Sequence, residues 1–144
     1  MMIELTILGR PQPYKAYKSG KYGTYNPVSE KKQIISAHIL TQFDRCPYEG
    51  ALSATFKFHF KRPKSHYYTG KRGHILRPDA PKYPIGDIHA KRRTLPDVSN
   101  LVKFYEDCME GIVFINDVQI VEHGENEKVW ADRDYTEILI YEMP

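Results

Sequence analysis

The sequence is poor in cysteine and tryptophan and contains no long apolar run. No segment approaches the roughly 20 apolar residues of a membrane-spanning helix, which excludes a helical membrane protein. Residues 1–5 carry neither the basic segment nor the cleavage motif of a secretion signal, so we expect a cytoplasmic protein. Cys46 and Cys108 are the two cysteines, and in a reducing compartment we expect both to be free thiols.

Charge, in contrast, is abundant and unevenly placed along the 144 residues, a length that fits a single domain over 1–144. Residues 1–60 hold 8 basic and 4 acidic residues, residues 61–93 hold 10 and 2, and residues 94–144 hold 3 and 12. A basic middle that binds a polyanion and an acidic end that binds a divalent cation would explain this pattern. Two solvated faces of opposite sign would explain it equally well.

The first half of the chain predicts a strand, a loop, a helix and a second strand. Apolar and polar residues alternate over 3–7, as in a half-buried strand. Residues 10–25 form a loop that interleaves tyrosines with basic residues and contains no acid. This composition suits phosphate contacts with base stacking, and it equally suits a tyrosine-rich turn packed on the sheet. Helical spacing predicts an amphipathic helix over 27–44 that is capped by Asn26, and alternation resumes over 55–60.

The proline-rich stretch 61–95 predicts a long basic loop, a kind of segment that is usually functional or disordered in a compact domain. Its ten cations indicate an arm that wraps nucleic acid. Its three histidines have no cysteine partner at zinc spacing, so we expect no structural zinc. His59, just before the arm, falls on the polar side of its strand and is expected at the surface.

The last third predicts one helix and further strands. Asp97 is a candidate N-cap for a helix over 98–110. Residues 118–130 indicate a strand that is interrupted at Gly124, and the strand at 135–142 is apolar enough to be buried on both faces. The order β-α-β-loop-α-β-β therefore predicts an α+β fold, with a single mixed sheet packed with two helices.

Asp97, Lys103 and Asp117 form the densest group of candidate catalytic residues. If the fold brings the helix start against the residues before the next strand, the two carboxylates and the lysine converge. Carboxylate oxygens suit Mg²⁺, with Mn²⁺ as a substitute, and a metal-activated water hydrolyses phosphodiesters. Lys103 would then stabilise developing negative charge. A helix cap, a turn aspartate and a surface ion pair explain the same three residues without chemistry.

Two motifs carry a resemblance to a known family. Pro-Asp-x-x-Asn-Leu-x-Lys at 96–103 and Asn-Asp-x-Gln-Ile at 116–120 resemble the signature of the RusA family of Holliday-junction resolvases. The strand and prolines over 3–13 and the basic run 62–67 are similar to the opening strand and basic loop of phage-borne members. The resemblance implies a RusA-like, homodimeric, Mg²⁺-dependent endonuclease that nicks opposed strands of four-way DNA junctions. It also implies no membrane partner, no small-molecule cofactor, and often a phage or prophage origin in a bacterial host.

By position, the resemblance makes the two aspartates and Lys103 catalytic, but two residues depart from the family pattern. Ser99 stands where a second Asp is usual, and Asn116 stands where the later Asp pair begins. Serine is a weaker Mg²⁺ ligand than a carboxylate, which puts full activity in question. Glu106 follows Ser99 by two helical turns on the same face, so we hypothesise that it joins the two aspartates as a metal ligand. Asp107 is predicted to pair with Lys103 instead.

Ten basic residues are the candidate DNA contacts: Lys15, Lys18, Lys61, Arg62, Lys64, Lys71, Arg72, Lys91, Arg92 and Arg93. Neutralising Arg92 and Arg93 should weaken binding and flatten its salt dependence, because each duplex phosphate contact adds roughly −0.9 to the log–log slope. Two other functions fit the sequence. One is a junction-binding protein that has lost catalysis through Ser99, and the other is a basic RNA-binding module that uses the tyrosine-rich loop for single strands. We favour the enzyme, because all three candidate catalytic residues are present.

Overall fold

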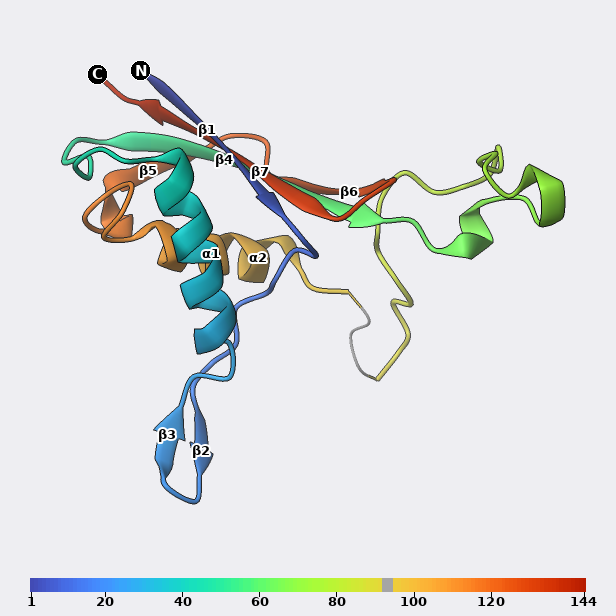
Figure 1. Ribbon diagram of the computed structural model, residues 1–144, viewed down its shortest axis with the longest axis horizontal. Helices are drawn as coiled ribbons and strands as arrows, with labels where there is room; N and C mark the ends of the chain where they lie inside the picture. Colours follow the sequence, from blue (N-terminus) through green and yellow to red (C-terminus); the bar gives the residue numbers. More distant parts are fainter. Residues whose placement is uncertain (92–94) are drawn as a thin grey trace.

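A mixed five-stranded sheet carries two helices on one of its faces in a computed structural model, which describes residues 1–91 and 95–144 (Figure 1). The strands are β1 (Met2–Leu8), β2 (Lys18–Gly20), β3 (Gly23–Tyr25), β4 (Leu52–Lys61), β5 (Ile120–His123), β6 (Glu127–Ala131) and β7 (Tyr135–Glu142). The helices are α1 (Ser29–Gln42) and α2 (Val98–Met109), with 3₁₀ turns η1 (Lys64–His66), η2 (Gly70–Arg72) and η3 (Asp117–Gln119). The predicted α+β class, with one mixed sheet and two helices, is confirmed.

The sheet is organised around β4, its longest strand. Strand β7 lies antiparallel between β1 and β4, and the opposite edge of β4 pairs in parallel with β5 and then with β6. The break between β5 and β6 begins at Gly124, as predicted. Only glycine fits at this position, because a side chain there would overlap the side chain of Thr55. Asn126 then accepts a hydrogen bond from the backbone N–H of Phe56 (2.9 Å), which fixes the chain against β4 before β6 begins.

The hydrophobic core lies between this sheet and the two helices. Alternate residues of three strands point into it, as the period of a strand requires. They are Ile3, Leu5 and Ile7 of β1, Phe56, Phe58 and Phe60 of β4, and Ile138 and Ile140 of β7. Burial of each such side chain contributes about 1.5–3 kcal/mol, which makes this layer the main source of stability.

Helix α1 differs from the sequence-based expectation. It begins at Ser29, because the Asn26 side chain accepts a hydrogen bond from the Val28 N–H (3.0 Å) and closes a turn before the helix. Within the helix only Ile39 is buried, whereas Leu40 is 55% exposed. The helix predicted over 27–44 therefore forms, but only part of its apolar side is buried, where α1 packs against α2 and β1.

The far face of the sheet corrects two further predictions. Strand β7 buries only its isoleucine side, and Tyr141 on the other side is 40% exposed. His59 on the same face is not a surface residue, since it is only 6% exposed. Its Nε2 lies 2.6 Å from Glu137 Oε1, and its ring stacks on Tyr135 with centroids 3.8 Å apart. A histidine on the polar side of a strand can thus be buried by its neighbours on the adjacent strand.

Two segments extend from this body (Figure 1). Strands β2 and β3 form a small hairpin, within the segment 10–25 for which the sequence predicted only a loop. The basic loop after β4 forms an arm folded on itself, with backbone hydrogen bonds from Tyr68 to Ile75 (3.0 Å) and from Arg77 to His66 (2.9 Å). No helix among the described residues is long and apolar enough to cross a membrane.

Candidate active site

Helix α2 separates a buried apolar side from an acidic polar side. Asp97 caps its first turn, with Oδ1 accepting hydrogen bonds from the Asn100 N–H (2.8 Å) and the Ser99 hydroxyl (3.2 Å). The helix ends before Gly111, whose φ of +84° favours glycine. Its buried residues are Leu101, Val102, Phe104, Tyr105, Cys108 and Met109. Packing of these residues fixes the helix rotation, so the charged side chains between them lie on the opposite side of the helix, where Glu106 and Asp107 are partly buried.

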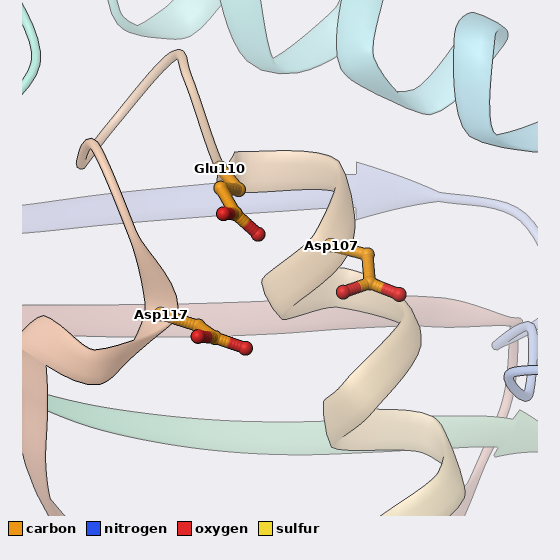
Figure 2. Close-up of side chains that lie close together, drawn as sticks. All are labelled: Asp107, Glu110 and Asp117. Atoms are coloured by element: carbon orange, nitrogen blue, oxygen red, sulfur yellow. The ribbon is translucent and has the colours of Figure 1, made fainter.

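Three carboxylates gather where α2 ends (Figure 2). Asp107 lies in the last turn, Glu110 is the C-terminal cap, and Asp117 lies in η3. One carboxylate oxygen from each residue can be chosen so that all three lie within 4.8 Å of one another, close enough to hold one metal ion. We call Asp107, Glu110 and Asp117 the acidic triad.

The second motif supplies the scaffold that holds Asp117. Asn116 accepts a hydrogen bond from the Val118 N–H (2.9 Å), and Gln119 accepts one from the Asn116 N–H (3.0 Å), which together cap η3. The Gln119 amide also donates to the carbonyl oxygens of Tyr48 (2.7 Å) and Gly50 (3.0 Å). The asparagine and glutamine of this motif therefore fix the turn, and Asn116 serves that purpose as well as an aspartate would.

Burial, and then repulsion between the carboxylates, perturb the titration of this acidic region. Burial, followed by the charges of Asp117 and Asp107, raises the pKa of Glu106 to about 7. Burial also raises the pKa of Asp107, and Asp117 adds to the increase while Lys32 and Lys103 oppose it. The nearby lysines therefore do not neutralise the region fully. A site with excess negative charge of this kind favours a bound cation.

The predicted catalytic residues lie apart, with Asp97 at the start of α2, Lys103 within it and Asp117 in η3. Asp117 belongs to the acidic triad, and the Lys103 charge acts on Asp107, as expected for residues four positions apart. The Lys103 Nζ also lies 4.0 Å from the centre of the Tyr14 ring. Asp97 precedes Asp107 by ten residues, about 15 Å along the helix axis. The structure therefore brings Asp117 together with the C-terminal end of α2 and not with Asp97.

Glu106 lies beside the triad without belonging to it. Its Oε1 is 3.0 Å from His123 Nε2 on β5, and its side chain is 15% exposed. After burial, the negative charge of Asp117 is the next largest cause of the raised pKa of Glu106. Glu106 is thus close to Asp117 and, like Asp107, distant from Asp97.

Asp97 lies between two adjoining surface hollows of about 490 and 370 Å³. Lys91 and Lys128 line the first hollow, and Arg10 and Lys15 line the second. Asp87 also lines the first hollow, so four cations against two carboxylates give this end of α2 a net positive surface, in contrast to the acidic end. Such a surface suits phosphate groups.

Glu110 was not predicted from the sequence as a site residue, and Asp107 was interpreted as a salt-bridge partner of Lys103. A signal was available, because residues three apart on a helix share a face and Asp107 and Glu110 are such a pair. Recognising it would have required the expectation that the chain turns back after Gly111 to deliver Asp117. His123 was missed as well, since nothing in the sequence places β5 beside Glu106.

The candidate DNA contacts are mostly exposed. Lys15, Lys18, Lys61, Lys64, Lys71, Arg72 and Lys91 are all exposed. Arg62 is partly buried and donates a hydrogen bond to the Pro81 carbonyl oxygen (2.7 Å), so it also folds the arm. The Arg72 guanidinium lies 4.2 Å from the centre of the Tyr68 ring. Arg92 and Arg93 lie outside the described residues.

Comparisons with known proteins identify the family. Residues 5–141 of the 144 match the family model described as endodeoxyribonuclease RusA. No curated protein matches the chain. The family match spans the sheet, both helices, the arm and the acidic triad, so the resemblance seen in two short motifs extends over nearly the whole fold. The chain belongs to the RusA endodeoxyribonuclease family.

Proposed function

We propose that this protein is a Mg²⁺-dependent endonuclease that resolves four-way DNA junctions by paired phosphodiester hydrolysis. The observation that carries the proposal is the acidic triad, in a chain that belongs to an endodeoxyribonuclease family. Paired nicks in a two-fold symmetric junction need two equivalent sites, and a homodimer supplies them. The proposed location in a bacterial cytoplasm and the proposed phage or prophage origin of the protein rest on its resemblance to phage-borne members of the family.

The donor chemistry of the triad fits a hard divalent cation. All three groups are carboxylates, and Glu110 and Asp117 are exposed to solvent, as a cation that retains water ligands requires. Mn²⁺ accepts the same oxygens and should substitute. When bound, such a cation supplies an acidified water and neutralises charge on the phosphate. Thiol and imidazole ligands are absent from the triad, so zinc is a poorer match.

The other charged residues have roles that follow from their positions. Lys103 lies between the two ends of α2, where its ammonium can stabilise the negative charge that develops as the P–O bond breaks. Its contact with the Tyr14 ring limits the directions in which the ammonium can point. Glu106 is proposed as an additional ligand through its closeness to Asp117. Asp97 remains a proposed catalytic and metal-binding residue through its motif, and the cations around it suit the phosphates of the DNA.

The test uses a synthetic four-way junction and a linear duplex of the same arm sequence. Cleavage is followed with Mg²⁺, Mn²⁺ and EDTA for the parent and for Asp97→Asn, Asp107→Asn, Glu110→Gln and Asp117→Asn. Glu4→Gln, an exposed acid on β1, is the matched control. Junction binding is measured separately in EDTA, so that a loss of cutting is not confused with a loss of binding.

Paired nicks in the junction alone, lost in EDTA and in Asp117→Asn, are the expected result. If Asp107→Asn and Glu110→Gln lose cleavage while Asp97→Asn keeps it, the metal is confined to the acidic triad. Asp97 would then serve only as a helix cap. The reverse pattern would assign catalysis to the N-terminal end of α2. Cutting that persists in EDTA would refute metal dependence.

A second candidate is a junction-binding protein without catalysis. The observation that favours it is the Ser99 hydroxyl, which donates to Asp97 where relatives would have a second carboxylate. Tight junction binding with no cutting in either metal would support this candidate. Ser99→Asp would then be expected to restore cleavage.

A further inference from the structure

The segment that leads into the hairpin of β2 and β3 is hydrogen-bonded to both helices. The Tyr14 N–H donates to the Asn100 carbonyl oxygen (2.9 Å), and the Gln12 N–H donates to the Tyr105 hydroxyl (3.1 Å). The Lys31 ammonium donates to the Gln12 side chain (2.9 Å) from α1. The segment that leads into the hairpin is therefore fixed to both helices, and the hairpin projects from a defined point (Figure 1).

The hairpin itself contributes no buried residue to the fold. Every residue of β2 and β3 is exposed, and the turn between them places Tyr22 at 93% exposure. Tyr17 and Tyr25 are 66% and 52% exposed. The contact between Lys21 and the Tyr22 ring, with Nζ 5.6 Å from the ring centre, is local to the turn. Folding therefore does not require aromatic side chains at these positions, and exposed aromatic groups on a projecting element indicate a binding surface.

The charge of this segment selects the kind of partner. Four basic residues and no acidic residue lie between Glu4 and Glu30, and Lys18 and Lys21 flank the exposed tyrosines. Aromatic rings with adjacent cations are the standard surface for unpaired nucleotides, whose bases stack while their phosphates are neutralised. The sequence alone left open a turn packed on the sheet, and the exposure of these tyrosines excludes that alternative.

The hairpin also lies next to the proposed DNA-binding surface. Tyr14 and Lys15, which lead into it, line the same hollow as Asp97 and Asn100. A DNA strand whose phosphate occupies that basic hollow would have its neighbouring nucleotides beside the hairpin. Each three-residue strand extends the hairpin by about 10 Å, so its tip can reach bases that the body of the protein cannot.

We propose that the β2–β3 hairpin is a wedge that enters the branch point, with Tyr22 stacking on a nucleobase that is unpaired or unstacked there. This inference rests on the proposed function, because it assigns the recognition of branched over linear DNA to one element. Linear duplex offers no free base face to Tyr22, whereas the centre of a junction does. The hairpin would therefore determine specificity and contribute little to general affinity for DNA.

The experiment measures binding of the full-length protein to a four-way junction and to the matched linear duplex, in EDTA so that the DNA stays intact. Tyr22→Ala should weaken junction binding roughly five- to 150-fold, the range for loss of one stacked base, and leave duplex binding unchanged. Tyr22→Phe retains the ring and should bind like the parent. Tyr141→Ala, an exposed tyrosine on β7, is the control for loss of a surface aromatic group. Because Tyr22 is almost fully exposed, none of these results depends on altered folding.

A second readout identifies the contact directly. A junction carrying 5-iododeoxyuridine at the branch point is irradiated with the parent protein and digested with trypsin. The cross-link should map to the peptide from Tyr22 to Lys31, which trypsin releases after Lys21. A cross-link mapped only to the basic arm would overturn the proposal.

The failures of the inference and of the proposed function are distinguishable. If the parent binds and cuts junctions but Tyr22→Ala does so equally well, only the wedge is refuted. Equal loss of junction and duplex binding would also refute it, because the hairpin would then be a general DNA contact. If the parent neither binds nor cuts junctions, or prefers single-stranded RNA, both the wedge and the resolvase function are refuted.

Discussion

Replacement of Glu106 by Gln should stabilise the metal-free protein in a pH-dependent way. The folded state raises the pKa of this carboxyl from an ordinary 4.5 to about 7 through burial and the charges of Asp117 and Asp107. Between these two values the folded state holds a proton that the unfolded state has lost, so stability falls as the pH rises. A change of one in the pKa corresponds to about 1.4 kcal/mol, so at pH 8 the ionised Glu106 carboxylate lowers the free energy of unfolding by about 3 kcal/mol. Glutamine has the same shape and no charge, and it removes this penalty.

The assay is urea unfolding in EDTA at pH values from 5 to 8.5. Glu106→Gln and the parent should differ little at pH 5 and should diverge by up to about 3 kcal/mol at pH 8 and above. Asp117→Asn is a useful companion, because it removes one of the two charges that act on Glu106 and should give a smaller gain. Added Mg²⁺ should stabilise the parent most at high pH, where the carboxylates are ionised.

Parallel stability curves for Glu106→Gln and the parent over this pH range would refute the reasoning. That outcome would mean that water or the nearby His123 ring stabilises the Glu106 carboxylate as well as bulk solvent does. The acidic region would then carry no electrostatic penalty for a cation to relieve.

Three further predictions follow from single features of the structure. A thiol reagent should modify one cysteine quickly in the native chain, the exposed Cys46, because burial raises the pKa of Cys108 to about 12; two fast thiols would contradict this. Asp97→Asn should change stability in urea by no more than about 0.5 kcal/mol, because Asn and Asp cap helices equally well, whereas Asp97→Ala should cost about 1 kcal/mol. Lys71→Ala combined with Arg72→Ala should reduce the salt slope of duplex binding by up to about 1.8, and an unchanged slope would exclude this part of the arm from the DNA interface.

The elements that bury a regular face could be predicted from the sequence. Strands β1 and β4 alternate apolar residues, and α2 has both a strong apolar side and an aspartate cap, so their bounds were close to correct. The prediction of secondary structure failed for elements in which buried and exposed residues do not alternate. Strands β2 and β3 have three exposed residues each, and only Gly20 and Gly23 mark the turn between them. Helix α1 has apolar residues at helical spacing, but the fold leaves two of them, Ile34 and Leu40, exposed.

The site could be predicted in its residue types and only partly in its geometry. Asp117 and Lys103 were identified, and the acidic character of the last third indicated a cation. The partners of Asp117 depend on how the chain turns after Gly111, and local periodicity does not encode that direction. The sequence suggested that the motifs at 96–103 and 116–120 would converge on Asp97. Among the described residues, Asp117 lies instead at the other end of α2, because η3 packs where this helix ends.

The acidic triad is placed where the fold alone would disfavour it. The C-terminal end of a helix carries partial negative charge, so cations are stabilising there and carboxylates are destabilising by about 0.3–1 kcal/mol each. The last turn of α2 contains no basic residue, yet Asp107 and Glu110 lie there and Asp117 approaches from η3. The helix dipole, the partial burial of Asp107 and repulsion between the carboxylates therefore all act against this arrangement, and packing of the core does not require it. A divalent cation opposes all three effects at once, which is the strongest physical reason to seek the metal at this end of α2.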